Sequence, residues 1–99
     1  MPTNQEAMFS SRTVEWETPS ALFAELDREF GPFTLDPCAT PENAKARRYF
    51  SWQDDGLRRS WAGERVFMNP PYGREIGKWV AKASREAAFG GALVVCLLP

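Results

Sequence analysis

The stretch RVFMNPPYGREIGKWVAKASREAAFGGALVVCLLP, residues 65–99, decides the fold. RVFM, residues 65–68, predicts a strand, and residues 73–89 predict an amphipathic helix that a Gly-Gly pair ends. ALVVCLLP, residues 92–99, is a continuous apolar run, which is typical of a strand buried on both faces of a parallel sheet. Together they predict one strand-helix-strand unit of an α/β protein. The helix residues expected on its buried face are Ile76, Trp79, Val80, Ala83 and Ala87.

The tetrapeptide Asn69-Pro70-Pro71-Tyr72 lies between the predicted strand and helix. In an open parallel sheet this junction is at the edge where ligands bind. Proline has a fixed φ and no N–H, so the loop offers the Asn69 side-chain oxygen and the Pro70 carbonyl as rigid acceptors beside an aromatic ring. A planar ligand with an exocyclic amine, such as adenine or cytosine, fits this arrangement. A structural interpretation stays open, in which the prolines end the strand and Tyr72 packs on the helix.

Two further elements are predicted upstream. Residues 18–30 predict a helix with Thr18 as its N-cap, Pro19 at its first position and Gly31 just past its end. FTLD, residues 33–36, predicts a strand that ends in an acid, which would therefore lie at the same edge as the Asn-Pro-Pro-Tyr loop. Farther along the chain, the aromatic residues Tyr49, Phe50 and Trp52 predict either a strand or a cover for the sheet. DDGL, residues 54–57, predicts a turn.

Composition limits the class of protein. The 99 residues are 43% apolar, which predicts one globular domain, residues 16–99, after a polar and flexible arm, residues 1–15. The 12 basic and 13 acidic residues provide no overall attraction to nucleic acid. Without histidine, and with Cys38 and Cys96 far apart, we expect reduced, buried thiols and no metal site. No secretion signal or membrane span is found, which predicts a cytoplasmic protein.

The loop NPPY, residues 69–72, resembles the catalytic loop of amino-methyltransferases that use S-adenosylmethionine. The chain as a whole is similar to one branch, the phage and prophage DNA N-6-adenine methyltransferases of the Dam type. The resemblance implies an incomplete Rossmann-like methyltransferase sheet, with three to four mostly parallel strands and flanking helices, because family members continue beyond LLP. The similar segments, in family order, are EWETPSALFAELDREFG, FTLDPCATPENAKARRYF, DGL, VFMNPPYGREIGKWVAKA and VVCLLP.

The resemblance also implies roles for particular residues. Asn69, Pro70, Pro71 and Tyr72 would hold and activate the 6-amino group of a flipped-out adenine in double-stranded DNA. For three of the residues expected at the cofactor a structural role stays open. Asp36 could cap the turn at Pro41, Thr18 is an N-cap candidate, and Asp55 is a turn residue. The residues expected at S-adenosylmethionine are Asp36, Pro37, Thr18, Pro19 and Asp55, with Asp54 an alternative to Asp55.

Other interpretations remain open. The glycine-rich turn that many methyltransferases have after the first strand is absent here, since Asp36 is followed by PCATPENAK. The same amine-holding loop also suits a methyltransferase acting on cytosine or on a protein amide. The alternative from another class is a non-catalytic, truncated methyltransferase-like module that acts through oligomerisation or binding. An incomplete sheet would have an open apolar edge, which a homodimer would cover.

Overall fold

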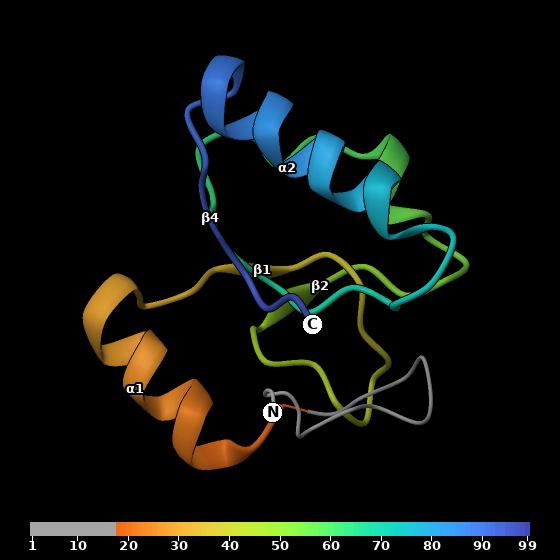
Figure 1. Cartoon of the computed structure of the whole chain (residues 1–99). Helices are drawn as coiled ribbons and strands as arrows, with labels where there is room; N and C mark the ends of the chain where they lie inside the picture. Colours follow the sequence, from red (N-terminus) through yellow and green to blue (C-terminus); the bar gives the residue numbers. More distant parts are fainter. Residues whose placement is uncertain (1–17) are drawn as a thin grey trace.

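The computed structural model describes residues 18–99, so the predicted arm lies outside the described residues. The four strands form one sheet, and the helices lie around it (Figure 1). The elements in order are α1 (Ser20–Phe30), β1 (Leu35–Asp36), β2 (Arg48–Tyr49), the 3-10 helix η1 (Gly56–Arg58), β3 (Arg65–Met68), α2 (Ile76–Phe89) and β4 (Leu93–Cys96).

The sheet has the order β2-β1-β3-β4, and every neighbouring pair is parallel. β3 and β4 pair along their full length, from Arg65 opposite Leu93 to Met68 opposite Cys96. The prediction of an incomplete α/β sheet with three to four mostly parallel strands is therefore confirmed. Because all strands are parallel, their carboxyl ends lie at one edge of the sheet.

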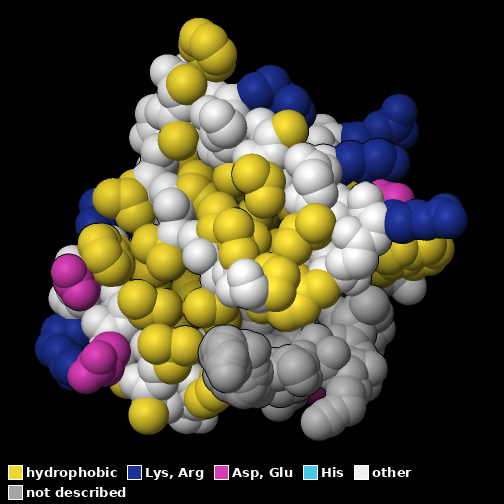
Figure 2. Space-filling model, in the orientation of Figure 1, with side chains coloured by type: hydrophobic (Ala, Val, Ile, Leu, Met, Phe, Trp, Pro, Cys, Tyr) yellow, Lys and Arg dark blue, Asp and Glu magenta, His cyan; other side chains and the backbone are white. Residues whose placement is uncertain are grey.

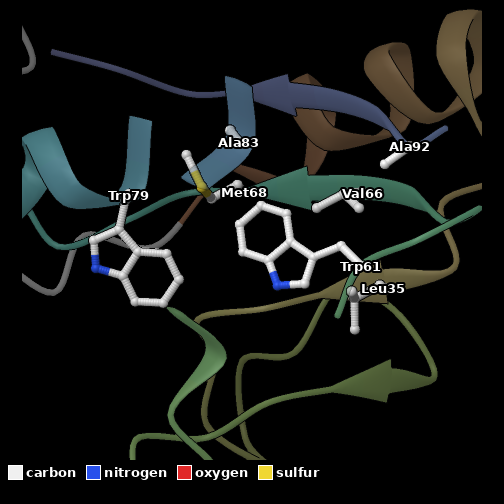
Figure 3. Packing of buried hydrophobic residues seen from close by; sticks show 7 residues of the cluster. All are labelled: Leu35, Trp61, Val66, Met68, Trp79, Ala83 and Ala92. Atoms are coloured by element: carbon white, nitrogen blue, oxygen red, sulfur yellow. The ribbon is translucent and has the colours of Figure 1, made fainter. Parts of the chain in front are cut away.

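α1 and α2 cover opposite faces of the sheet. Side chains alternate along a strand, so neighbouring residues of β3 contact different helices. Val66 and Met68 face the core cluster that includes Trp79 of α2 (Figure 3). Phe67 faces the other way, and its ring is 5.1 Å from that of Phe23 on α1. The core on the α2 side is built around Trp61, which is fully buried and stacks on Trp79 with ring centroids 6.4 Å apart.

The predicted N-cap of α1 is wrong. The helix begins at Ser20, Pro19 occupies the N-cap position with extended backbone, and no side chain caps the first turn. The physical reason is that the Thr18 hydroxyl has another partner: Thr18 Oγ1 accepts a hydrogen bond from the Asn69 side chain, and Thr18 is buried.

β4 differs from the prediction of a strand buried on both faces. It is an edge strand of the sheet that the described residues form, so Leu93 is 37% exposed and the other residues of β4 are half-buried. Figure 2 shows a broad expanse of hydrophobic side chains on this side of the molecule. Of the predicted inner face of α2, Trp79 and Ala83 are buried and Ile76 is half-buried. Val80, 39% exposed, and Ala87 are exposed, so the prediction is wrong for these two.

Candidate active site

A cavity of about 1010 Å³ lies at the carboxyl ends of β1, β2 and β3. Its walls are the loops that follow these strands and the first turns of α2, as the parallel sheet predicts. Three of the residues predicted for the site, Pro19, Pro70 and Tyr72, do not line the cavity. Those that line it are Thr18, Asp36, Pro37, Asp55, Asn69 and Pro71.

Asn69 follows β3 directly, and its side chain joins two distant segments. Asn69 Nδ2 donates a hydrogen bond of 2.9 Å to Thr18 Oγ1. Thr18 is only 6% exposed, so water does not readily compete for this bond. Because Asn69 Nδ2 points toward Thr18, Asn69 Oδ1 must point away from Thr18. The contact orients the acceptor atom that the sequence predicted to be functional.

Tyr72 supports the same amide from the other side. Its hydroxyl lies 3.4 Å from Asn69 Oδ1 and 3.3 Å from the backbone oxygen of Leu97, just beyond β4. A phenol has one proton and donates it to one acceptor at a time. Tyr72 can therefore turn to Leu97 and leave Asn69 Oδ1 to accept from a ligand. Burial raises the pKa of this phenol, so it stays protonated at neutral pH.

Asp36 is the last residue of β1 and is 4% exposed. Its carboxylate accepts hydrogen bonds from the backbone N–H of Lys45 at 2.9 Å and of Cys38 at 3.4 Å. Burial raises the pKa of Asp36 from 3.8 to about 6, although these two bonds and the charge of Lys45 oppose the rise. At neutral pH the carboxylate is therefore mostly charged and poorly solvated, which favours a cationic ligand beside it.

The loop after β1 has its own local stabilisation. The backbone N–H of Thr40 donates to Asn43 Oδ1 at 2.8 Å, and that of Asn43 donates to Thr40 Oγ1 at 3.2 Å. Asp36 is therefore not the cap of this turn. Cys38 and Cys96 are free thiols, as expected, but both are only half-buried by exposed area, so the prediction that they are buried is wrong. Burial and the nearby charge of Asp36 raise the pKa of Cys38, which disfavours a thiolate nucleophile.

Asp55, rather than Asp54, lines the cavity. Asp54 folds back into its own turn and accepts hydrogen bonds from Ser51 N at 2.9 Å and Ser51 Oγ at 3.0 Å. These bonds lower the pKa of Asp54. Asp55 adopts a left-handed backbone with φ of 59°, and its half-exposed carboxylate lies 3.9 Å from Arg58.

A buried support under the cavity escaped the sequence prediction. Trp61 Nε1 donates to the backbone oxygen of Gly56 at 3.0 Å. Trp61 is held in turn by its backbone N–H on Glu86 and by Lys82, whose ammonium lies 5.4 Å from the indole ring. Lys82 is 7% exposed and pairs with Glu86 at 2.7 Å. Lysine is rarely buried, so its place on this helix face gave no signal in the sequence.

Two tryptophans of the cavity wall were also missed. Trp79 was predicted as a core residue but also reaches the cavity. Trp52 was predicted as a strand residue or sheet cover, whereas β2 ends at Tyr49 and Trp52 is 90% exposed at the cavity wall. Its position two residues before the DDGL turn, residues 54–57, was the available signal.

Among residues 18–99, no group of three or more histidine, cysteine or acidic side chains is placed to hold a metal ion. Within the same range, neither helix is long and apolar enough to cross a membrane. The groups that the described residues bring to the cavity are an oriented amide oxygen, a buried carboxylate, a second carboxylate and aromatic walls.

Comparison with known proteins gives the family. The model of the family DNA N-6-adenine-methyltransferase (Dam) matches residues 6–99. A DNA N-6-adenine-methyltransferase of Escherichia phage T1 is 35% identical over 60 residues, which are 60% of this chain and 25% of that protein. A putative methyltransferase of Escherichia coli, YfdM, is 37% identical over 65 residues, 59% of this chain and 70% of that protein. No solved structure matches significantly. Because the family match includes nearly every residue, the chain belongs to the DNA N-6-adenine-methyltransferase (Dam) family.

Proposed function

We propose that this chain contains the methyl-donor site and the amine-holding loop of a DNA adenine methyltransferase. The reaction is methyl transfer from S-adenosylmethionine to the 6-amino group of a flipped-out adenine in double-stranded DNA. The observation that supports this most strongly is that Asn69 and Asp36, from two neighbouring strands, line one cavity. The name of the phage T1 relative includes the same reaction, although this chain spans only a quarter of that protein.

The Asn69 loop suits the acceptor amine. An adenine 6-amino group has two N–H donors, and Asn69 Oδ1, which lines the cavity, would accept a hydrogen bond from one of them. The Pro70 carbonyl was predicted as the second acceptor, but Pro70 does not line the cavity in this structure. Hydrogen bonds accepted from the amine N–H groups draw the nitrogen lone pair out of conjugation with the ring and make the nitrogen more nucleophilic. Pro70 and Pro71 keep the loop rigid, and Thr18 keeps the amide oxygen facing the ligand. The work of these residues is positioning, which can supply a large part of the rate enhancement of an in-line transfer.

The remaining cavity suits the methyl donor. When bound, S-adenosylmethionine supplies the methyl group on a sulfonium centre, and it is a cation. The buried carboxylate of Asp36 is the strongest attraction for a cation in the described site. Pro37 and the apolar side chains of Leu57 and Trp79 line the same cavity, as expected for a ligand with a large apolar surface.

The proposed reaction is tested by incubating the protein with labelled S-adenosylmethionine and duplex DNA, followed by digestion and separation of the nucleosides. We expect the label in N6-methyl-2′-deoxyadenosine from the DNA. Label in N4-methylcytosine, or in the protein itself, would instead support one of the other amino-methyltransferase activities that the loop allows. Absence of any transfer by a folded, donor-binding protein would contradict the proposed function.

A second proposal concerns assembly and follows from the edge strand. β4, residues Leu93–Cys96, is uncharged and half-exposed, and it has none of the charges or prolines that usually protect a sheet edge. We propose that two copies pair through β4 in a homodimer. This arrangement serves the enzyme as well as the non-catalytic alternative, in which assembly is itself the function.

Leu93→Lys is expected to convert this dimer to a monomer, because a charge on the paired strand must lose water at the interface. Light scattering on a size-exclusion column measures the change. Leu22→Lys on α1 is the matched control, since Leu22 is 38% exposed and Leu93 37%. A monomeric wild-type protein, or a dimer that both variants keep, would rule out pairing through β4.

A further inference from the structure

Trp52 is the most exposed of the large apolar side chains in residues 18–99. It is 90% exposed, although tryptophan is among the most costly residues to leave in water. Its backbone is nevertheless held firmly. Asp54 N and Asp55 N donate to Ser51 O at 3.1 and 3.2 Å, and Arg59 Nε donates to Asp54 O at 2.7 Å. The turn therefore holds the Trp52 backbone in place at the cavity wall, while the indole ring is exposed to solvent.

That place is the wall of the cavity, at the end opposite Asn69. Trp52 follows β2, Asn69 follows β3, and β1 lies between them. Two strand spacings separate β2 from β3, which amounts to about 10 Å. Asp55 also lines the cavity and belongs to the same turn region as Trp52. It is the acidic cavity residue nearest to Trp52 in the sequence. The far end of the cavity thus combines an exposed indole with a hydrogen-bond acceptor, a pair suited to an aminopurine ring.

The strand order indicates which purine that ring is. A target base held by its amine at Asn69 lies over β3. The methyl donor is longer, since a ribose separates its sulfonium from its adenine, and it must reach Asn69 with its methyl group. Its adenine then extends across β1, over Asp36 and Pro37, toward the loop after β2.

We propose that Trp52 is the stacking surface for the adenine ring of the S-adenosyl methyl donor. This inference rests on the proposed function and adds to it the residue that recognises the donor's ring. Base-aromatic stacking contributes roughly 1–3 kcal/mol when measured by alanine substitution. Converted at 1.4 kcal/mol per tenfold, this corresponds to a loss of donor affinity of roughly 5- to 100-fold.

Calorimetric titration with S-adenosylhomocysteine, without DNA, tests the proposal. We expect Trp52→Ala to weaken binding roughly 5- to 100-fold and Trp52→Phe, which keeps a ring, to stay within about threefold of wild type. Phe89→Ala is the matched control. Phe89 is 88% exposed but ends α2, so it lies toward the opposite edge of the sheet and does not line the cavity. The Phe89→Ala variant is expected to bind S-adenosylhomocysteine with the affinity of the wild type.

A spectroscopic measurement separates stacking from a structural effect. The indole N–H resonance of Trp52, assigned by its absence in Trp52→Phe, is expected to shift on addition of S-adenosylhomocysteine. Wild-type affinity in Trp52→Ala would overturn the proposal, as would equal losses in Trp52→Ala and Trp52→Phe. Lower duplex affinity of Trp52→Ala, with unchanged S-adenosylhomocysteine affinity, would assign the ring to DNA and also overturn it. If the wild type binds S-adenosylhomocysteine through Trp52 but transfers no methyl group, the proposed function fails and this inference stands.

Discussion

Replacing Asn69 by alanine is expected to lower methyl transfer to DNA adenine by roughly 100- to 1,000-fold, the effect of removing one oriented polar group from a reacting centre. Alanine removes the acceptor oxygen for the amine. It also removes the donor to Thr18 Oγ1, which lies 2.9 Å from Asn69 Nδ2. The loss should occur mainly in kcat, measured with labelled S-adenosylmethionine at saturating DNA, because amine activation matters most in the transition state.

Asn69→Asp is the matched variant. Aspartate keeps an oxygen toward the amine, and its second oxygen can accept a hydrogen bond from the Thr18 hydroxyl. We expect it to retain transfer within about tenfold of wild type, far above Asn69→Ala. Circular dichroism and S-adenosylhomocysteine binding establish that both variants are folded. Transfer by Asn69→Ala at the wild-type rate would show that this side chain does not hold the amine.

The architecture was accessible to sequence analysis where a local pattern and the tertiary environment agree. Residues 65–68 form β3 as predicted, and the α2 region forms a helix, although it begins at Ile76 rather than near Gly73. The parallel sheet edge then follows from topology, which is why Asp36 and Asn69 were both placed at the ligand edge before any contact was known. The hydrophobic periodicity of these segments and the parallel strand-helix-strand connection were sufficient to predict this part of the fold.

The remaining features depend on contacts between distant residues. Thr18 has every local property of an N-cap, yet its hydroxyl is bonded to a side chain 51 positions away. The apolar composition of β4 predicted full burial, but burial depends on which strand lies beside it, and β4 is at the edge. Lys82 is polar in sequence and buried in space because Glu86 and Trp61 surround its ammonium. No local pattern contains these partners.

Gly56→Ala is expected to have the largest effect on stability of any single-methyl change in the site. A Cβ at this position would lie 2.1 Å from the backbone oxygen of Pro37 and 3.2 Å from Trp79 Cη2. The Pro37 oxygen belongs to the backbone and cannot rotate away. Overpacking of this kind costs typically 1–3 kcal/mol, which corresponds to a fall in Tm on the order of 10 °C for a domain of this size.

The substitution should also weaken donor binding, because the Gly56 backbone connects a buried hydrogen bond to a residue of the cavity wall. Its carbonyl accepts from Trp61 Nε1, and its neighbour Asp55 lines the cavity. Displacing Gly56 from Pro37 therefore moves Asp55 away from the edge where Asp36 lies. We expect S-adenosylhomocysteine affinity to fall together with Tm, measured by calorimetry below the melting transition.

Gly77→Ala adds the same methyl group where there is room for it. No described atom outside its own helix turn lies within 4 Å of the point that the new Cβ would occupy. Gly77 is in the first turn of α2, where alanine favours the helix by at most about 1 kcal/mol. This variant should melt at or above the wild-type temperature and bind S-adenosylhomocysteine normally. Equal Tm values for the Gly56 and Gly77 variants would mean that the backbone at Pro37 yields easily. The close approach of the two loops would then not be what fixes Asp55 at the cavity.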